Sequence, residues 1–144
     1  MIKGFRHVCV VVSDLGRSLR FYRDIMGLKV SKVLTIEGEG PETVLGVKGI
    51  KLTYVKMRSP DQPEESPPVF ELHYWENPRI SCESGYNHIS FTVTAIEKEN
   101  DRLSQAGVKF ISRPINVSYS KAKLCFCYDP DNHLIELVEE EKEA

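Results

Sequence analysis

The sequence lacks three features that would each assign the protein to a large functional class. Its longest unbroken apolar run, Val8 to Val12, is far shorter than the ~20 residues that a membrane-spanning helix needs. Its first residues, Met-Ile-Lys-Gly, carry no apolar stretch typical of a secretory signal. Positive charge is not in excess, since 19 Lys and Arg stand against 21 Asp and Glu, and phosphate binding needs clustered positive charge. We therefore expect a cytoplasmic protein that binds neither membranes nor nucleic acids.

Cysteine is too scarce, and too often placed in strands, for a disulfide framework. Three of the four cysteines, Cys9, Cys125 and Cys127, lie in strand-like runs rather than in loops. Cys125 and Cys127 share one face of a strand, so their Cα atoms should lie ~6–7 Å apart along it. Because that separation suits a disulfide poorly, the sequence predicts reduced, structural thiols.

An internal repeat is the strongest pattern present. Residues 6–15 read R-H-V-C-V-V-V-S-D-L, and residues 87–96 read N-H-I-S-F-T-V-T-A-I. Each copy is a histidine, an alternating strand, a polar helix cap and the start of a helix. Each copy is also followed, further along the chain, by an apolar-Glu-Leu strand. The 144 residues therefore read as a duplication within the length of one compact domain.

Strand, helix, strand, strand, strand is the order predicted for each half. The first half is expected to have a strand at 5–13, a helix from Leu15 to Met26, and strands at 29–36, 50–57 and 69–75. The second half is expected to have a strand at 88–93, a helix opened by a Thr94–Glu97 capping box and ended near Ala106, and strands at 108–111, 121–128 and 133–139. Glycine is dense between Gly38 and Gly49, which predicts a loop. Gly27 and Gly107 suit the positions just past the two helices, and Asn132 suits a left-handed turn position.

These elements predict an α+β fold. We expect residues 1–144 to form a single domain of two tandem βαβββ modules, at about 1–76 and 86–140. Each module has too small a core to be stable alone. The strands are therefore expected to form one curved mixed sheet around a cavity.

Two histidines and two glutamates occupy matching places in the two modules. His7 and His88 open the first strands, while Glu71 and Glu136 lie inside the later apolar strands. A buried carboxylate is costly unless it meets a cation or hydrogen-bond donors. Imidazoles combined with carboxylates suit a divalent Ni, Zn, Co, Mn or Fe ion. Any one of the four alone reads as a structural residue, but the matched set predicts a metal site with His7, Glu71, His88 and Glu136 as ligands.

Three further residues are predicted to line a pocket. His73 and Trp75 share a strand face with Glu71, and Cys9 shares a face with His7, although a packed thiol is the commoner role for such a cysteine. His133 follows a turn and is expected at the surface.

The repeated plan, the histidine that opens each module and the run Y-D-P-D-N-H-L-I-E-L at 128–137 resemble the vicinal oxygen chelate superfamily. Residues 17–28 also resemble the first-helix pattern of that superfamily. Its members include glyoxalase I, methylmalonyl-CoA epimerase, extradiol dioxygenases, and fosfomycin- and bleomycin-resistance proteins. The resemblance covers the whole chain and places the family's metal positions on the same two histidines and two glutamates. Because members commonly pair, it also implies a homodimer.

The resemblance to glyoxalase I and methylmalonyl-CoA epimerase implies a metal-dependent lyase or isomerase. Such an enzyme moves a proton next to the carbonyl of a small-molecule substrate, and the metal stabilises the enediolate or enolate as a Lewis acid. The family assigns the proton transfer to the last ligand, here Glu136, with Glu71 as the alternative. The segment 116–121 lacks the glycines that help hold glutathione in glyoxalase I. Asn87-His88 also stands where epimerases have two histidines, so the substrate is left open.

Two alternatives come from other classes. A non-catalytic small-molecule-binding protein, as in the resistance proteins, needs no metal, and the complete ligand set favours the enzyme instead. The other alternative is a non-haem iron dioxygenase of the extradiol type. Members of that type have a His and a Tyr at defined places in the regions that correspond to Ser118–Ser120 and Cys125–Phe126, and this sequence has neither residue at the matching places.

Overall fold

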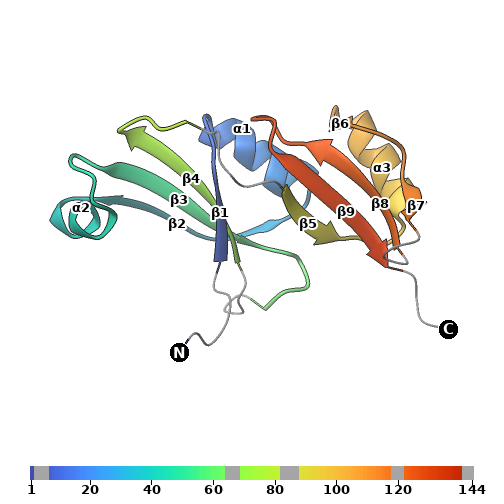
Figure 1. Ribbon diagram of the computed structural model, residues 1–144, viewed down its shortest axis with the longest axis horizontal. Helices are drawn as coiled ribbons and strands as arrows, with labels where there is room; N and C mark the ends of the chain where they lie inside the picture. The colour runs from blue at the N-terminus through green and yellow to red at the C-terminus, as the bar shows by residue number, and fades with distance from the viewer. Residues whose placement is uncertain (2–6, 64–68, 82–87, 118–121, 141–144) are drawn as a thin grey trace. The chain divides into compact units, whose positions relative to one another are not determined.

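The computed structural model describes residue 1 and residues 7–63, 69–81, 88–117 and 122–140. Asn87 and Ser118–Ser120, which stand at positions that differ among family members of different activity, lie outside the described residues. The chain divides into two compact units, Met1–Glu83 and Ser84–Ala144. Each unit is a sheet with helical cover of its own (Figure 1).

The first unit contains β1 (His7–Val11), α1 (Leu15–Leu19), η1 (Arg20–Ile25), β2 (Lys29–Glu37), α2 (Glu39–Leu45), β3 (Lys51–Arg58) and β4 (Val69–Asn77). Its four strands form a sheet in the order β1-β4-β3-β2. β1 pairs with β4 in parallel, and the other two pairs are antiparallel. The helical segment α1–η1 therefore carries the chain from one edge strand, β1, to the other, β2.

Local sequence explains where this helical segment begins and ends. Asp14 is extended (φ −143°), and its carboxylate accepts a hydrogen bond from the backbone N–H of Arg17, so it is the N-cap. The segment continues as a π-helix, in which the N–H of Met26 donates to the carbonyl of Phe21 at 2.8 Å. Gly27 then adopts φ 87°, as predicted for the residue just past the helix.

One face of the sheet forms the core with this helical segment. Tyr22 is fully buried, and its ring lies 5.0 Å from that of Phe70 on β4. Along β3, residues that face the helical segment alternate with residues on the opposite face of the sheet, as expected for a pleated strand. The buried apolar side chains on this side are Val10, Val12, Phe21, Tyr22, Leu28, Val55, Met57, Phe70 and Leu72. The opposite face of the sheet is therefore left for other uses.

The glycine-rich stretch predicted as a loop contains a short helix, α2. It begins after Gly38 (φ 95°) and ends at Gly46 (φ 68°), so the glycines mark its two ends rather than an irregular loop. None of its residues is buried. Because α2 buries no face, its sequence needs no apolar stripe of helical period, and that stripe is the pattern that would have predicted a helix.

The second unit contains β5 (His88–Thr92), α3 (Ile96–Gln105), β6 (Lys109–Phe110), β7 (Ile115–Val117), β8 (Ala122–Tyr128) and β9 (Leu134–Glu140). Its sheet runs β5-β9-β8-β6, and β7 also pairs with β8. The first strand again lies at an edge, parallel to the last strand. The counterpart of β2 is divided into β6 and β7, whereas a single strand at 108–111 was predicted here.

The start of α3 differs from the predicted Thr94–Glu97 capping box. The N-cap is Ala95 in the left-handed conformation (φ 51°), and no side chain of the N-cap makes a capping hydrogen bond. Glu139 on β9 supplies the cap instead, since its carboxylate accepts from the N–H groups of Ala95 (3.1 Å) and Ile96 (2.9 Å). The helix end and the last turn are as predicted, with Gly107 at φ 92° and Asn132 at φ 64°.

The α+β class, built from two tandem modules, is confirmed. The strand ladders of the described residues form two hydrogen-bonded sheets, one in each unit, where one continuous sheet was expected. Two sheets form because the first strand of each module pairs with the last strand of the same module.

Candidate functional site

The parallel pairing of β1 with β4 brings a histidine and a glutamate to one face of the first sheet. Cys9 pairs with Glu71, and Val11 pairs with His73. Because side chains alternate along a strand, the residues at odd positions of both strands, His7 and Glu71 included, project from the face opposite the helical segment. Glu71 is nevertheless only 3% exposed. The fold therefore places a carboxylate almost out of water next to imidazoles.

Both oxygens of the Glu71 carboxylate have an imidazole nearby. Oε1 lies 3.0 Å from Nε2 of His73 in hydrogen-bond geometry. Oε2 lies 3.3 Å from Nδ1 of His7, which is an ion-pair distance, but it makes no hydrogen bond. A buried carboxylate oxygen without a donor is destabilising. This oxygen is therefore suited to receive a cation.

His73 supports the negative charge of Glu71. Burial by itself lowers the pKa of His73, but hydrogen bonds with Cys9 and Glu71 outweigh burial, so the pKa is raised above its ordinary value. The imidazole consequently carries its positive charge to a higher pH than an exposed histidine does. That charge partly compensates the buried carboxylate.

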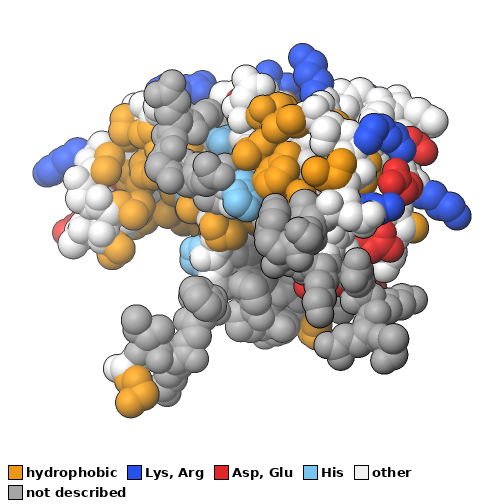
Figure 2. Space-filling model, turned by 45° about the vertical axis from the view of Figure 1, so that its right-hand side comes forward, with side chains coloured by type: hydrophobic (Ala, Val, Ile, Leu, Met, Phe, Trp, Pro, Cys, Tyr) orange, Lys and Arg blue, Asp and Glu red, His pale blue; other side chains and the backbone are white. Residues whose placement is uncertain are grey.

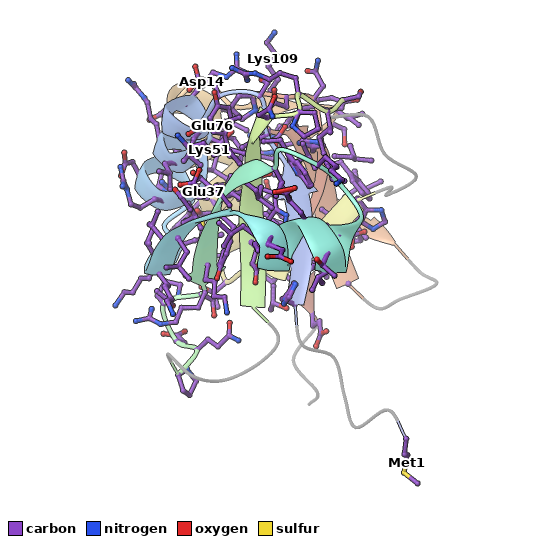
Figure 3. All side chains as sticks on the ribbon, turned by 90° about the vertical axis from the view of Figure 1, so that its left-hand side faces the viewer. Met1, Asp14, Glu37, Lys51, Glu76 and Lys109 are labelled. Carbon is purple, nitrogen blue, oxygen red and sulfur yellow. The ribbon has the colours of Figure 1, made fainter. Side chains whose placement is uncertain are left out.

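A cleft of about 440 Å³ opens on this face of the first unit. Its volume is in the range of small-molecule sites. The cleft is lined by His7, Ile36, Gly40, Pro41, Val44, Leu45, Leu52, Tyr54, Lys56, Glu71, His73 and Trp75. Of the predicted lining residues, His73 and Trp75 are among them and Cys9 is not. The cleft thus combines the histidines and glutamate of β1 and β4 with the short helix α2, which lies in front of the strands in Figure 3.

The contribution of α2 and β3 to this cleft was missed by sequence reasoning. Alternation along the predicted strand at 50–57 places Leu52, Tyr54 and Lys56 on a common face, so a signal was present. Nothing in the sequence says which face lines a cleft, because both faces of this strand carry apolar residues. Figure 2 shows histidine side chains next to hydrophobic ones on the molecular surface.

In the second unit, the other predicted pair lies on neighbouring strands. Glu136 on β9 pairs with Ser90 on β5, and the Ser90 hydroxyl donates to its Oε1 at 2.8 Å. The ring of His88 meets the edge of Phe126 at a centroid distance of 5.4 Å. His88 is exposed and Glu136 is half-buried. Both side chains are therefore accessible to a ligand.

The residues present fit a divalent metal in chemistry, although no preformed cage is seen. Among the described residues, no three His, Cys, Asp or Glu side chains form a group that could hold a metal ion. The predicted ligands instead fall into His/Glu pairs, one pair in each unit. Oε2 of Glu71 makes no hydrogen bond and lies beside the imidazole of His7, and a carboxylate next to an imidazole is the donor arrangement that a borderline cation such as Zn or Ni prefers.

The remaining predicted residues have structural surroundings. Cys9, Cys125 and Cys127 are free thiols, as predicted, and burial raises the pKa of Cys127 to about 12. The surface position predicted for His133 is wrong, since its side chain is only 9% exposed and its Nδ1 lies 2.7 Å from Oδ2 of the fully buried Asp129 side chain. Asp129 also accepts from the N–H groups of Asp131 and His133. This pair holds the turn before β9.

Sequence comparison assigns the family. The sequence model of the Glyoxalase/Bleomycin resistance protein/Dioxygenase superfamily matches residues 4–137. The chain therefore belongs to this superfamily, as the resemblance of its motifs indicated.

Curated relatives carry the name lactoylglutathione lyase. The chain is 28% identical to a probable lactoylglutathione lyase of Synechocystis over 134 residues, which are 92% of each chain. It is 31% identical to the lactoylglutathione lyase of Schizosaccharomyces pombe, where the match covers 92% of this chain and 46% of the yeast protein.

Solved structures agree on the fold. A glyoxalase family protein from Bacillus cereus superimposes with a TM-score of 0.83 at 23% identity, over 99% of this chain and 97% of its own. The trypanothione-dependent glyoxalase I of Leishmania major gives a TM-score of 0.71 at 26% identity, over 96% and 88% of the two chains. Within the described residues, no helix is both long and apolar enough to span a membrane.

Proposed function

We propose that the protein is a metal-dependent lyase or isomerase of the glyoxalase I or methylmalonyl-CoA epimerase type. The observation that supports this most is the buried Glu71 carboxylate, whose Oε2 lies beside His7 without a hydrogen bond. That carboxylate also lines a cleft of small-molecule size. The names of the relatives agree with a lyase of this superfamily.

In this proposal, His7, Glu71, His88 and Glu136 are the metal ligands. The ion is a divalent Ni, Zn, Co, Mn or Fe, and when bound it supplies Lewis acidity toward the substrate carbonyl. Glu136 takes the proton from the carbon next to that carbonyl, and the hydroxyl of Ser90 orients its carboxylate. Glu71 is the alternative proton acceptor. It is held by His73 and kept from water by burial.

The partners in this proposal are few. The substrate is a small organic molecule, because the cleft has the volume for one. We also propose that residues 1–144 act as a single glyoxalase-like domain, that two copies pair, and that the protein works in the cytoplasm without nucleic acid or membrane partners.

Metal content of the purified protein tests the proposal directly. We expect a near-stoichiometric divalent metal in the wild type and a loss of at least about tenfold in metal affinity for Glu71→Gln and Glu136→Gln. Elemental analysis after dialysis against a weak chelator measures both. The matched controls are Glu76→Gln on β4, whose carboxylate pairs with exposed Lys51 (Figure 3), and Glu140→Gln on β9. Full metal retention in both Glu71→Gln and Glu136→Gln would contradict the assignment of ligands.

A non-catalytic binding protein is the second candidate. One observation favours it: no metal-holding group of three side chains is present among the described residues. This candidate predicts a protein that takes up no divalent metal even after reconstitution but still binds a ligand in the cleft. The same metal analysis therefore separates the two functions.

A further inference from the structure

The floor of the cleft in the first unit changes from polar to apolar along its strands. At one end Lys56 pairs with Glu71, and one step further Tyr54 pairs with His73. At the other end Leu52 on β3 pairs with Trp75 on the neighbouring strand β4 and with Ile36 on the neighbouring strand β2. Residues 71 and 75 are four apart on a strand, so the two ends are separated by ~13 Å.

The short helix α2 extends the apolar end. Val44 is 84% exposed and Leu45 is 45% exposed, and both line the cleft. Such side chains gain stability when an apolar ligand removes them from water. Two hydrogen bonds place α2 at the end of the sheet where Trp75 lies. The N–H of Gly49 donates to the carboxylate of Glu42 on α2. The carbonyl of Gly49 accepts from the side chain of Asn77, two residues beyond Trp75 on β4.

Among the described lining residues, the Lys, Arg, Asp and Glu side chains are Lys56 and Glu71, and both lie at the polar end. Lys56 is the one Lys or Arg among the described lining residues, and it pairs with Glu71 on the neighbouring strand. A glutathione conjugate carries two carboxylates and an ammonium group spread along a peptide. Among the described residues that line the apolar end, none carries a charge that compensates those of such a conjugate, and burying an unpaired charge is costly.

We propose that the cleft binds a carbonyl compound with an uncharged aryl or alkyl group, rather than a glutathione-type conjugate. The oxygen-bearing head lies against Glu71 and His7, with Lys56 available for one negative charge. The apolar group lies against Trp75, Leu52 and the exposed side chains of α2. This inference rests on the proposed function only in taking Glu71 and His7 as the reacting end.

Trp75 makes the binding measurable, because it is the single tryptophan of the chain and lines the cleft. The purified protein, after incubation with divalent metal, is titrated with three probes while its fluorescence is followed: 2-oxo-4-phenylbutanoate, pyruvate and S-lactoylglutathione. The first two share a head and differ in the apolar group. We expect 2-oxo-4-phenylbutanoate to bind at least about tenfold more tightly than pyruvate, and S-lactoylglutathione to bind no more tightly than pyruvate. Equal affinity for the two oxo acids, or tightest binding of the glutathione thioester, would overturn the inference.

A matched pair of variants locates the binding. Val44→Asn places an amide at the apolar end, and Val33→Asn makes the same change at an exposed residue of β2 that does not line the cleft. We expect Val44→Asn to weaken the binding of 2-oxo-4-phenylbutanoate at least about fivefold and to leave the affinity for pyruvate unchanged. Val33→Asn should change neither affinity. Identical behaviour of the two variants would overturn the location.

The metal content of the same preparations keeps the two proposals apart. Retained metal without a preference for the phenyl compound overturns this inference alone. A preference for the phenyl compound in a protein that takes up no metal supports this inference and overturns the proposed metal-dependent reaction.

Discussion

At the scale of single residues, neighbours decide the chemistry of each titratable group. Glu71 is held between His7 and His73, and its buried Oε2, which makes no hydrogen bond, is a strong acceptor. Glu136 occupies the equivalent place in the second unit, but its neighbour is the hydroxyl of Ser90. Two glutamates at matching places of a repeat therefore meet different surroundings. We accordingly expect their substitutions to have different effects on metal affinity and on proton transfer.

The cysteines offer a prediction at this scale. Burial raises the pKa of Cys127 to about 12 and also raises the pKa of Cys125, so at pH 8 roughly one Cys127 in 10⁴ is a thiolate. Cys9 is exposed. Cys82, the fourth cysteine, lies outside the described residues, so the test uses a Cys82→Ser background. In that background, we expect Ellman's reagent to modify one thiol quickly in the native protein and all three remaining thiols after unfolding in guanidinium. Rapid modification of a second thiol under native conditions would show that the interior of the second sheet opens.

At the scale of elements, the start of α3 depends on a residue distant in sequence. Glu139 accepts hydrogen bonds from the N–H groups of Ala95 and Ile96, which otherwise lack a capping side chain. A carboxylate at this position also interacts favourably with the helix dipole. The side chain thus links β9 to the helix that packs beside it.

Replacement of Glu139 tests this link. We expect Glu139→Ala to lower the free energy of unfolding by about 1 kcal/mol, the usual value of an N-cap. Urea unfolding followed by circular dichroism measures the change. Glu140→Ala, one residue further along β9 and exposed, serves as the control and should be neutral. Equal effects of the two substitutions would mean that the cap contributes nothing to stability.

At the scale of the whole molecule, the chain consists of two units of similar plan. Each has a parallel pair formed by its first and last strands, an antiparallel remainder and a helix after the first strand. Among the described residues of the second unit, the buried apolar side chains are Ile96, Leu103, Val108, Ala122, Leu124, Cys125, Cys127, Ile135 and Leu137. A core of this size is marginal for a domain of its own.

Fragment stability is therefore the prediction at this scale. We expect residues 84–144, expressed alone, to show no cooperative thermal transition, because so short a chain buries too little apolar surface. The full chain should show one. Differential scanning calorimetry of both proteins makes the comparison. A reversible, cooperative transition of the fragment would establish the second unit as an independent domain.

Sequence alone determined the repeated plan, the α+β class and most element positions. These follow from local physics: alternation of apolar residues in strands, Asp14 at a helix start, and Gly27 and Gly107 past helix ends. The two histidines and two glutamates were also identifiable from the repeat, and their roles as ligands remain a prediction. Predictions from local sequence were wrong where an element depends on a residue far away in the chain, or where the element has no buried face. Glu139 capped α3 in place of Thr94, and α2 has no buried face to reveal it.

Tertiary structure decided which residues share a site. Strand register placed Glu71 between His7 and His73 and placed Lys56 beside Glu71. Register also put Leu52 against Trp75 and so created an apolar end to the cleft. No sequence pattern contains this information, because register and burial arise from pairing between segments far apart in the chain. The residue types came from the sequence, and their arrangement into a polar and an apolar end came from the packing of strands and α2.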